Sequence, residues 1–240
     1  MKLLDGAYWA RALRSPTVLV GLAVDLAPVY GVLAWGWGAA PLVMLYWLEN
    51  LLAGVMTLPR IVVSGANYGP FGLLGGMFLS AFFIFHYGLF CAVHGTFLLV
   101  FFSMFSGLEN GMPFEPMDIP GMVRLALTSG LHMNWVLALT FAFQVFVLAW
   151  QFGLKGDWKT TNPMAEMMAP YARIVVLHIG IFAGAGALIL LGDPMIGVLA
   201  LIIFKTIWGV KTNADAPDGD LVRRGNESFS NLRDLVRKSS

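Results

Sequence analysis

Three of the four histidines in this chain lie in apolar segments, where an imidazole ring needs a partner. The stretch FHYGLFCAVHG contains His86 and His94, and the stretch LHIGIFAGAGA contains His178. Both stretches share the order His, any residue, Gly, an aliphatic residue and Phe. Neutral imidazole is a common ligand of zinc, iron and other transition metals. A metal ion is therefore one candidate partner for these rings, and a hydrogen-bonding group on a neighbouring helix is the other.

A carboxyl group accompanies the histidines in a separate apolar segment, LYWLENLLAG. Tyr46, Glu49, Asn50 and Ala53 recur there at helical spacing, so they share one face of a helix. A carboxylate in an apolar environment needs a cation, a metal ion or hydrogen-bond donors, because desolvation otherwise protonates it. Glu49 is therefore either a metal ligand or an acid that holds neighbouring helices together.

We predict a transition-metal site with His86, His178 and Glu49 as ligands and one position open for water or substrate. The two similar stretches predict copies on parallel helices, which would place His86 and His178 at equal depth and facing each other. His94 follows His86 by eight residues, which is about 80° around a helix and about 12 Å along it. His94 is a further candidate ligand, or a ring that bonds a backbone carbonyl. The polar residues that would orient the ligands are Tyr46, Asn50 and Gln144.

Two more charged residues in apolar segments are candidate counter-ions for this site. Asp25 lies three residues before Pro28, and Lys205 lies in the stretch IIFKTIWG. Asp25 could instead cap the turn that Pro28 distorts, because proline removes one backbone donor from a helix. Lys205 could instead extend its ammonium group to the inner membrane surface.

The composition identifies the class of protein that must position these residues. The chain is 58% hydrophobic and only 12% charged, with a mean hydropathy of +0.74. A soluble domain carries about 25% charged residues, so the sequence predicts an all-α protein of the lipid bilayer. Cys91 is the only cysteine, which excludes an intramolecular disulfide and a metal site built from several cysteines.

Six segments are long and apolar enough to cross a hydrocarbon core of about 30 Å. They are residues 16–36, 40–60, 72–104, 131–153, 172–192 and 194–210. Residues 67–76 precede the third segment, and Pro70 with its neighbouring glycines predicts an interfacial lead-in there rather than helix. The six-helix domain, residues 16–210, is flanked by a cytoplasmic N-terminal segment, 1–15, and a polar cytoplasmic tail, 211–240.

The basic residues predict the orientation of the bundle. With the N-terminus in the cytoplasm, the connections on the inner side receive every basic residue outside the spans except Arg124. Basic residues gather on the cytoplasmic side of membrane proteins, so both termini are predicted to be cytoplasmic. Residues 106–122, which carry Glu109, Glu115 and Asp118, are then outside. Because membrane orientation accounts for the placement of the basic residues, they do not indicate nucleic-acid binding.

Small residues predict close helix contacts. Gly180 and Gly184 form a G-x-x-x-G pattern, which lets helix backbones approach closely in lipid. Such a face packs within the bundle, or it contacts a second copy of the chain or another membrane protein.

The motifs YWLEN, HYGLF…HG and LHIGIFAGA resemble an uncharacterised bacterial integral membrane family, known only as a domain of unknown function. The resemblance covers roughly residues 40–105 and 172–210 and implies a bacterial inner-membrane protein. It also implies that Glu49, His86, His94 and His178 occupy motif positions of the family, and it brings no activity with it. The stretch TIWGVKTN after Lys205 lacks the acidic and histidine residues associated with that helix end in the family.

The sequence therefore favours a membrane protein with a buried His/Glu site that binds zinc, iron or manganese, in which case it could be a membrane metalloenzyme. Three alternatives remain. Two of the histidines could ligate a b-type haem for electron transfer, or the ionisable groups could form the proton or ion path of a carrier. In the third, a scaffold, the polar groups only hydrogen-bond between helices. No serine-hydrolase elbow, zincin helix or phosphate loop occurs.

Overall fold

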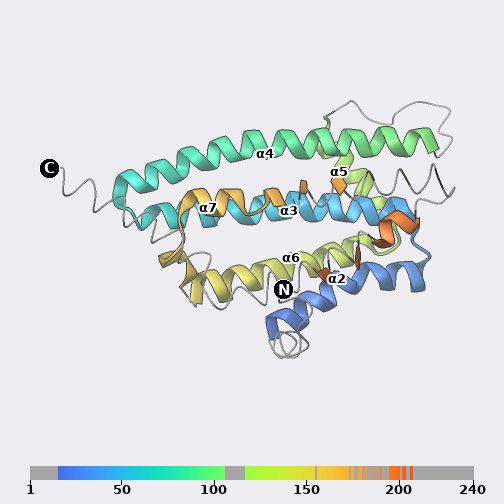
Figure 1. Cartoon of the computed structure of the whole chain (residues 1–240), viewed down its shortest axis with the longest axis horizontal. Coiled ribbons are helices and arrows are strands. Elements are labelled where there is room, and N and C mark those ends of the chain that lie inside the picture. Colours follow the sequence, from blue (N-terminus) through green and yellow to red (C-terminus); the bar gives the residue numbers. More distant parts are fainter. Residues whose placement is uncertain are drawn as a thin grey trace.

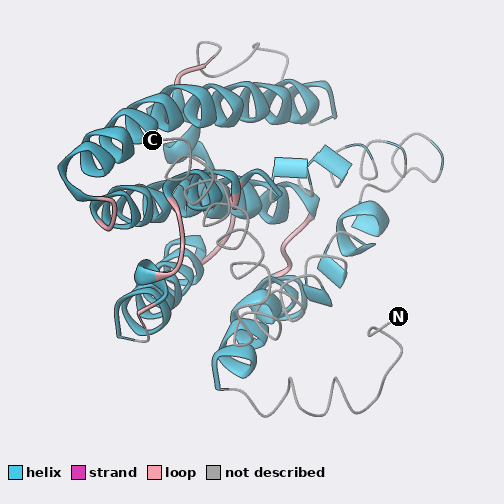
Figure 2. Ribbon diagram, turned by 60° about the vertical axis from the view of Figure 1, so that its left-hand side comes forward, coloured by secondary structure: helices cyan, strands magenta, loops and turns pink. Residues whose placement is uncertain are grey.

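The computed structural model describes residues 16–105, 117–154 and 156–172, and a set of separate residues beyond them. That set is 174, 175, 178, 179, 182, 186, 190, 195–200, 202, 203, 206 and 207. The elements are α2 (Pro16–Trp35), α3 (Ala39–Ala66), α4 (Gly69–Phe105), α5 (Ile119–Thr128), α6 (Met133–Val147), the π-helix η2 (Leu148–Leu154), the 3-10 helix η3 (Asp157–Lys159) and α7 (Pro163–Met168). Within the described part of the chain all of these elements are helices (Figures 1 and 2).

Four helices are long and apolar enough to cross a membrane: Val18–Trp35, Ala39–Ala66, Gly69–Val100 and Met133–Leu154. They correspond to the first four predicted spans, and they confirm that the chain is a helical membrane protein. The predicted spans 172–192 and 194–210 lie partly outside the described residues, and their separately described positions from 174 to 207 are helical. The predicted N-terminal segment, the cytoplasmic tail and residues 106–116 of the outer loop lie outside the described residues.

The start of α4 differs from the sequence-based expectation. We expected residues 67–76 to precede the helix, but α4 begins at Gly69 and includes Pro70. Proline is tolerated in the first turn of a helix because its missing N–H would have no helical partner there. A Cβ on Gly72 would lie 2.5 Å from the carbonyl oxygen of Gly65 on α3. The glycine that weakens a helix in isolation thus permits a close backbone contact between α3 and α4.

Helices α3 and α4 form an antiparallel pair that runs the length of the molecule (Figure 1). Polar side chains of each helix bond the other. The Trp47 indole Nε1–H donates to the carbonyl oxygen of Cys91 at 2.8 Å. The Tyr87 hydroxyl lies 3.0 Å from both the backbone oxygen and Oδ1 of Asn50, to which it donates. These bonds fix the register of the two helices in an environment that offers no water as an alternative partner.

Two apolar clusters hold the described helices together. The first surrounds Trp47 and extends from the start of α3 to Met122 of α5, Met133 of α6 and Val198. The second lies nearer the C-terminal end of α3 and the N-terminal end of α4, and its buried members are Ile61, Phe83, Tyr87, Cys91, Met167 and Ile174. The second cluster therefore places α7 and the residues after it against both α3 and α4.

Helix α5 was not predicted. It begins after Asp118, whose Oδ1 accepts the backbone N–H of Gly121 at 3.1 Å, and it has Pro120 in its first turn. Both features are helix-start signals, but the segment is too short to span a membrane and carries Arg124. The search for long apolar segments therefore did not identify α5.

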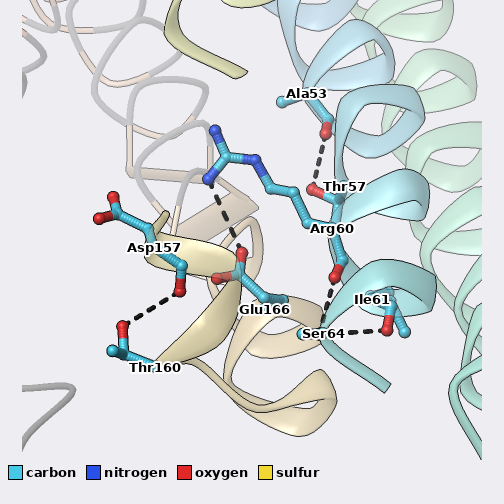
Figure 3. A network of polar contacts seen from close by, with 8 residues as sticks. All are labelled: Ala53, Thr57, Arg60, Ile61, Ser64, Asp157, Thr160 and Glu166. Atoms are coloured by element: carbon cyan, nitrogen blue, oxygen red, sulfur yellow. Dashed lines mark hydrogen bonds and ion pairs between the residues drawn. The ribbon is translucent and has the colours of Figure 1, made fainter. Parts of the chain in front are cut away.

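A polar cluster joins the end of α3 to α7 (Figure 3). Arg60 Nη1 lies 3.7 Å from Glu166 Oε2, and the guanidinium also lies 5.4 Å from the centre of the Phe152 ring. On the same helix the Ser64 hydroxyl donates to the backbone oxygen of Arg60 at 2.7 Å. These contacts position α7, and with it the residues that follow toward Tyr171.

Candidate functional site

His94 and His178 meet at the contact between α4 and the helical residues after α7. His94 Nε2 lies 2.9 Å from Nε2 and 3.0 Å from Nδ1 of His178. The ring centres are 4.0 Å apart, and the ring planes stand at 87°. Because the two distances are nearly equal, His94 Nε2 points at the ring of His178 rather than at one of its nitrogens. His94 is 3% exposed and His178 is half-buried, so the contact is partly buried.

Backbone carbonyls determine where the hydrogens of the two rings lie. His94 Nδ1 is 2.7 Å from the oxygen of Phe90, and His178 Nδ1 is 3.0 Å from the oxygen of Ile174. A carbonyl oxygen only accepts hydrogen bonds, so in both bonds the Nδ1 carries the hydrogen. Each neutral ring then keeps its lone pair on Nε2. Histidines that bind metals use this arrangement, in which the nitrogen that does not bind donates to a carbonyl or carboxylate.

The His94 Nε2 lone pair faces two nitrogens of His178. It lies 3.0 Å from Nδ1, whose hydrogen it can accept, and 2.9 Å from Nε2, which also carries a lone pair. One hydrogen shared between the rings therefore satisfies the neutral pair, and a metal cation bound by both Nε2 atoms would satisfy it as well. The helices thus hold two Nε2 lone pairs close together.

His86 has a different partner. Its Nδ1 lies 2.7 Å from the hydroxyl oxygen of Tyr171. The Tyr171 ring rests on four rings of α4, with centre-to-centre distances of 5.6 to 6.4 Å. Those rings are Phe83, His86, Tyr87 and Phe90. Phe90 also separates the His86–Tyr171 pair from the His94–His178 pair along the helix.

The observed pairing differs from the one that the similar stretches suggested. We expected His86 to face His178, whereas the ring that contacts His178 is that of His94. His94 lies eight residues beyond His86, so the two helices are offset by about 12 Å from the alignment of the two sequence motifs. The offset follows from Tyr171, whose ring packs beside His86 and takes the place that the alignment assigned to His178.

Glu49 and Asn50 are deeply buried on α3, at 4% and 3% exposure. Asn50 Oδ1 accepts the Tyr87 hydroxyl, and its Nδ2 has no hydrogen-bond partner among the described residues. Glu49 on α3 and Asp25 on α2 both act electrostatically on the Tyr46 hydroxyl. The Tyr46 hydroxyl therefore lies within electrostatic range of two carboxyl groups, one on α2 and one on α3.

The two remaining predicted residues are Gln144 and Lys205, and no described contact joins Gln144 to the histidines. Gln144 is half-buried on α6, where its backbone oxygen accepts the N–H of Leu148 at the start of the π-helix. Lys205 lies outside the described residues. In the part of the chain that the structure describes, no group of three or more His, Cys, Asp or Glu side chains is arranged to hold a metal ion. Of the four predicted ligands, the structure brings two into contact, His94 and His178.

The comparison with protein families supports the resemblance seen in the motifs. The model of one family matches residues 7–225, which is nearly the whole chain and includes all the helices described above. The chain belongs to DUF6498, a family of unknown function. No curated protein and no solved structure matches it. Membership in DUF6498 therefore carries no activity to this chain, and a function must be argued from the residues.

Two residues that the sequence analysis did not select complete the arrangement. Tyr171 bonds His86, and Trp47 ties α3 to the backbone of α4 one turn before His94. Trp47 is part of the YWLEN motif and could have been chosen with Glu49. Tyr171 precedes the predicted fifth span, so a search restricted to polar residues within spans did not reach it.

Proposed function

We propose that the protein binds one transition-metal ion between His94 and His178. The observation that supports the proposal is the 2.9 Å separation of the two Nε2 atoms, with each Nδ1 within hydrogen-bond distance of a carbonyl oxygen. Two imidazole nitrogens on one tetrahedral ion are roughly 3.4 Å apart. A separation of the rings by about 0.5 Å, with a rotation of His178 about its side-chain bonds, would accommodate an ion.

Imidazole ligands suit zinc and iron, and they also occur with manganese. Two protein ligands leave further positions for water or a substrate, which is the property that separates catalytic from structural metal sites. Glu49 is not part of a three-residue group with the histidine pair. We therefore assign the two histidines to the metal and leave Glu49, which lies within electrostatic range of Tyr46, out of the ligand set.

The ring contact favours a single ion over a b-type haem, because a bis-histidine haem places a porphyrin between the two rings. Proton transfer is the second candidate function, since 2.9 Å also suits a shared proton between two imidazoles. Elemental analysis and an absorption spectrum of the detergent-purified wild-type protein separate the three. We expect about one metal ion per chain and no Soret band. A Soret band would support haem binding. A protein that stays metal-free after incubation with Zn²⁺ and Fe²⁺ would support proton transfer.

We further propose six membrane spans with both termini in the cytoplasm of a bacterium and the bundle in its inner membrane. Arg60 and Glu166 meet at the end of α3, and Lys159 lies on η3 between α6 and α7. Arg124 lies on α5, at the other end of the molecule in Figure 1. The basic residues at the first end support its cytoplasmic placement.

Cysteine labelling tests this orientation. In a Cys91→Ala background, a cysteine introduced at Gly111 should react with a membrane-impermeant maleimide in intact spheroplasts, and one introduced at Lys159 should react only after permeabilisation. The reverse pattern would contradict the proposed orientation.

A further inference from the structure

His86 lies near the middle of the apolar span Gly69–Val100, 17 residues after its start and 14 residues before its end. At 1.5 Å per residue this span is about 47 Å long, so a span centred in the bilayer extends beyond both faces of a hydrocarbon core of about 30 Å. In that position His86 lies about 2 Å from the mid-plane and about 13 Å from the nearer face of the hydrocarbon core.

One nitrogen of this ring has no partner among the described residues. His86 Nδ1 bonds the Tyr171 hydroxyl at 2.7 Å, and that is its only hydrogen bond within the described part of the chain. If the Tyr171 hydroxyl donates to Nδ1, Nε2 carries a hydrogen that needs an acceptor. If Nδ1 donates instead, both the phenol hydrogen and the Nε2 lone pair need partners. Either arrangement leaves a polar group unsatisfied in hydrocarbon, where this costs several kcal/mol.

The ring lies at the border between the interior and the lipid. His86 is half-buried, and its neighbours on the outer side of α4 are exposed: Phe82 at 45%, Phe85 at 71% and Leu89 at 41%. On its inner side Phe83 and Tyr87 are buried. A molecule dissolved in the bilayer could therefore reach His86 sideways, without passing through the protein.

The depth of His86 restricts the chemistry of such a molecule. Phospholipid ester and phosphate groups stay at the interface, roughly 15 Å from the mid-plane, so they do not reach this ring. When the Tyr171 hydroxyl donates to Nδ1, the ligand must be uncharged, soluble in hydrocarbon and equipped with a hydrogen-bond acceptor for the Nε2–H of His86. Long-chain quinones meet these conditions, because their polar groups are carbonyl and ether oxygens on a flat ring that partitions into the bilayer interior.

We propose that His86 and Tyr171 form a binding site for a membrane quinone. The Tyr171 hydroxyl donates to His86 Nδ1, and the His86 Nε2–H donates to a quinone carbonyl. Phe82 stacks on the His86 ring with centres 5.2 Å apart and an interplanar angle of 13°, which holds the imidazole in place. The exposed aromatic side chains beside it supply apolar contact for the quinone ring. This site is separate from the His94–His178 pair and does not depend on a metal ion there.

Equilibrium binding of tritiated decylubiquinone tests the proposal. The full-length protein is placed in nanodiscs of quinone-free phospholipid, and empty nanodiscs measure the partition of the quinone into lipid. We expect saturable binding of about one quinone per chain above the empty-disc level. His86→Phe should lower the affinity by about tenfold, the change expected for one lost hydrogen bond. Tyr171→Phe should lower it by less, because the donor to the quinone remains.

Two variants control for indirect effects. His86→Gln keeps a donor and should recover part of the affinity that His86→Phe loses. Tyr30→Phe removes the hydroxyl of an exposed tyrosine on α2 and should bind as the wild type does. All variants are first shown to be folded by an unchanged thermal midpoint. Binding no higher than in empty nanodiscs, equal affinity in His86→Phe and wild type, or full displacement of the quinone by palmitate would each overturn the proposal.

Discussion

Replacement of Gly65 by alanine is expected to lower the thermal midpoint of the detergent-purified protein by roughly 3–10 °C. A Cβ at Gly65 would lie 2.6 Å from the carbonyl oxygen of Gly72 and 3.1 Å from the Cα of Gly76. Both neighbours are backbone atoms of α4, so no side chain can rotate out of the way. Overpacking of this kind costs about 1–3 kcal/mol. Because α3 and α4 carry most of the polar contacts described above, their separation should destabilise the whole bundle.

Gly88→Ala is the matched control for this prediction. Gly88 is also in a helix, and an added Cβ would have no heavy atom within 4 Å. The change from glycine to alanine stabilises a helix interior by about 0.5–1 kcal/mol, so the thermal midpoint should stay or rise. The two midpoints are measured by circular dichroism during heating. Equal midpoints for Gly65→Ala and Gly88→Ala would show that the contact between α3 and α4 is looser than described.

The membrane class and the first four spans could be predicted because they depend on local composition alone. About 20 apolar residues are required by the thickness of the bilayer, whatever the helix contacts. The start of α4 could not be predicted in this way. Glycine is unfavourable in an isolated helix, and only the contact of Gly72 with Gly65 on another helix explains its position. Tertiary packing outweighed local helix propensity at this point.

The candidate residues could be selected from sequence, but their partners could not. His94 and His178 were chosen because ionisable groups in apolar segments are unusual. Their pairing depends on how far one helix slides along the other. That offset is determined by Tyr171 and by the apolar cluster around Ile61 and Ile174, which are contacts between distant parts of the chain. The similarity of the two histidine stretches carries no information about it.

Glu49 illustrates the same limit. Its helical face with Tyr46 and Asn50 was predictable from spacing, and the structure buries all three residues. Which helix that face meets was not predictable. Asn50 bonds Tyr87 of α4, whereas the Tyr46 hydroxyl lies within electrostatic range of Glu49 and of Asp25 on α2. The residues of this face therefore have different neighbours. Among the described residues, Glu49 does not form a three-residue metal-binding group with His94 and His178.

Replacement of His94 or His178 by alanine is expected to reduce the bound metal from about one ion per chain to less than about 0.1. Loss of one of two imidazole ligands leaves a single ligand, and one imidazole does not hold an ion against washing with a chelator. His94→Gln and His178→Gln should lose the metal as well. Because glutamine fills more of the ring's volume than alanine does, the glutamine variants separate loss of the ligand from loss of packing.

Two further variants separate the competing ligand sets. The set predicted from sequence includes His86 and Glu49, so under that hypothesis His86→Ala and Glu49→Gln would lose the metal. Under the pairing described here, His86 bonds Tyr171 and Glu49 lies with Tyr46, so both variants should keep it. Each variant is compared at equal protein concentration after confirmation that its thermal midpoint is close to that of the wild type.

The decisive measurement is the number of metal ions per chain, determined by mass spectrometry of the purified wild type and of the four single variants His94→Gln, His178→Gln, His86→Ala and Glu49→Gln. The pairing of His94 with His178 predicts about one ion in the wild type, His86→Ala and Glu49→Gln, and less than about 0.1 in the other two. Full metal occupancy in both His94→Gln and His178→Gln would contradict a metal site at this pair.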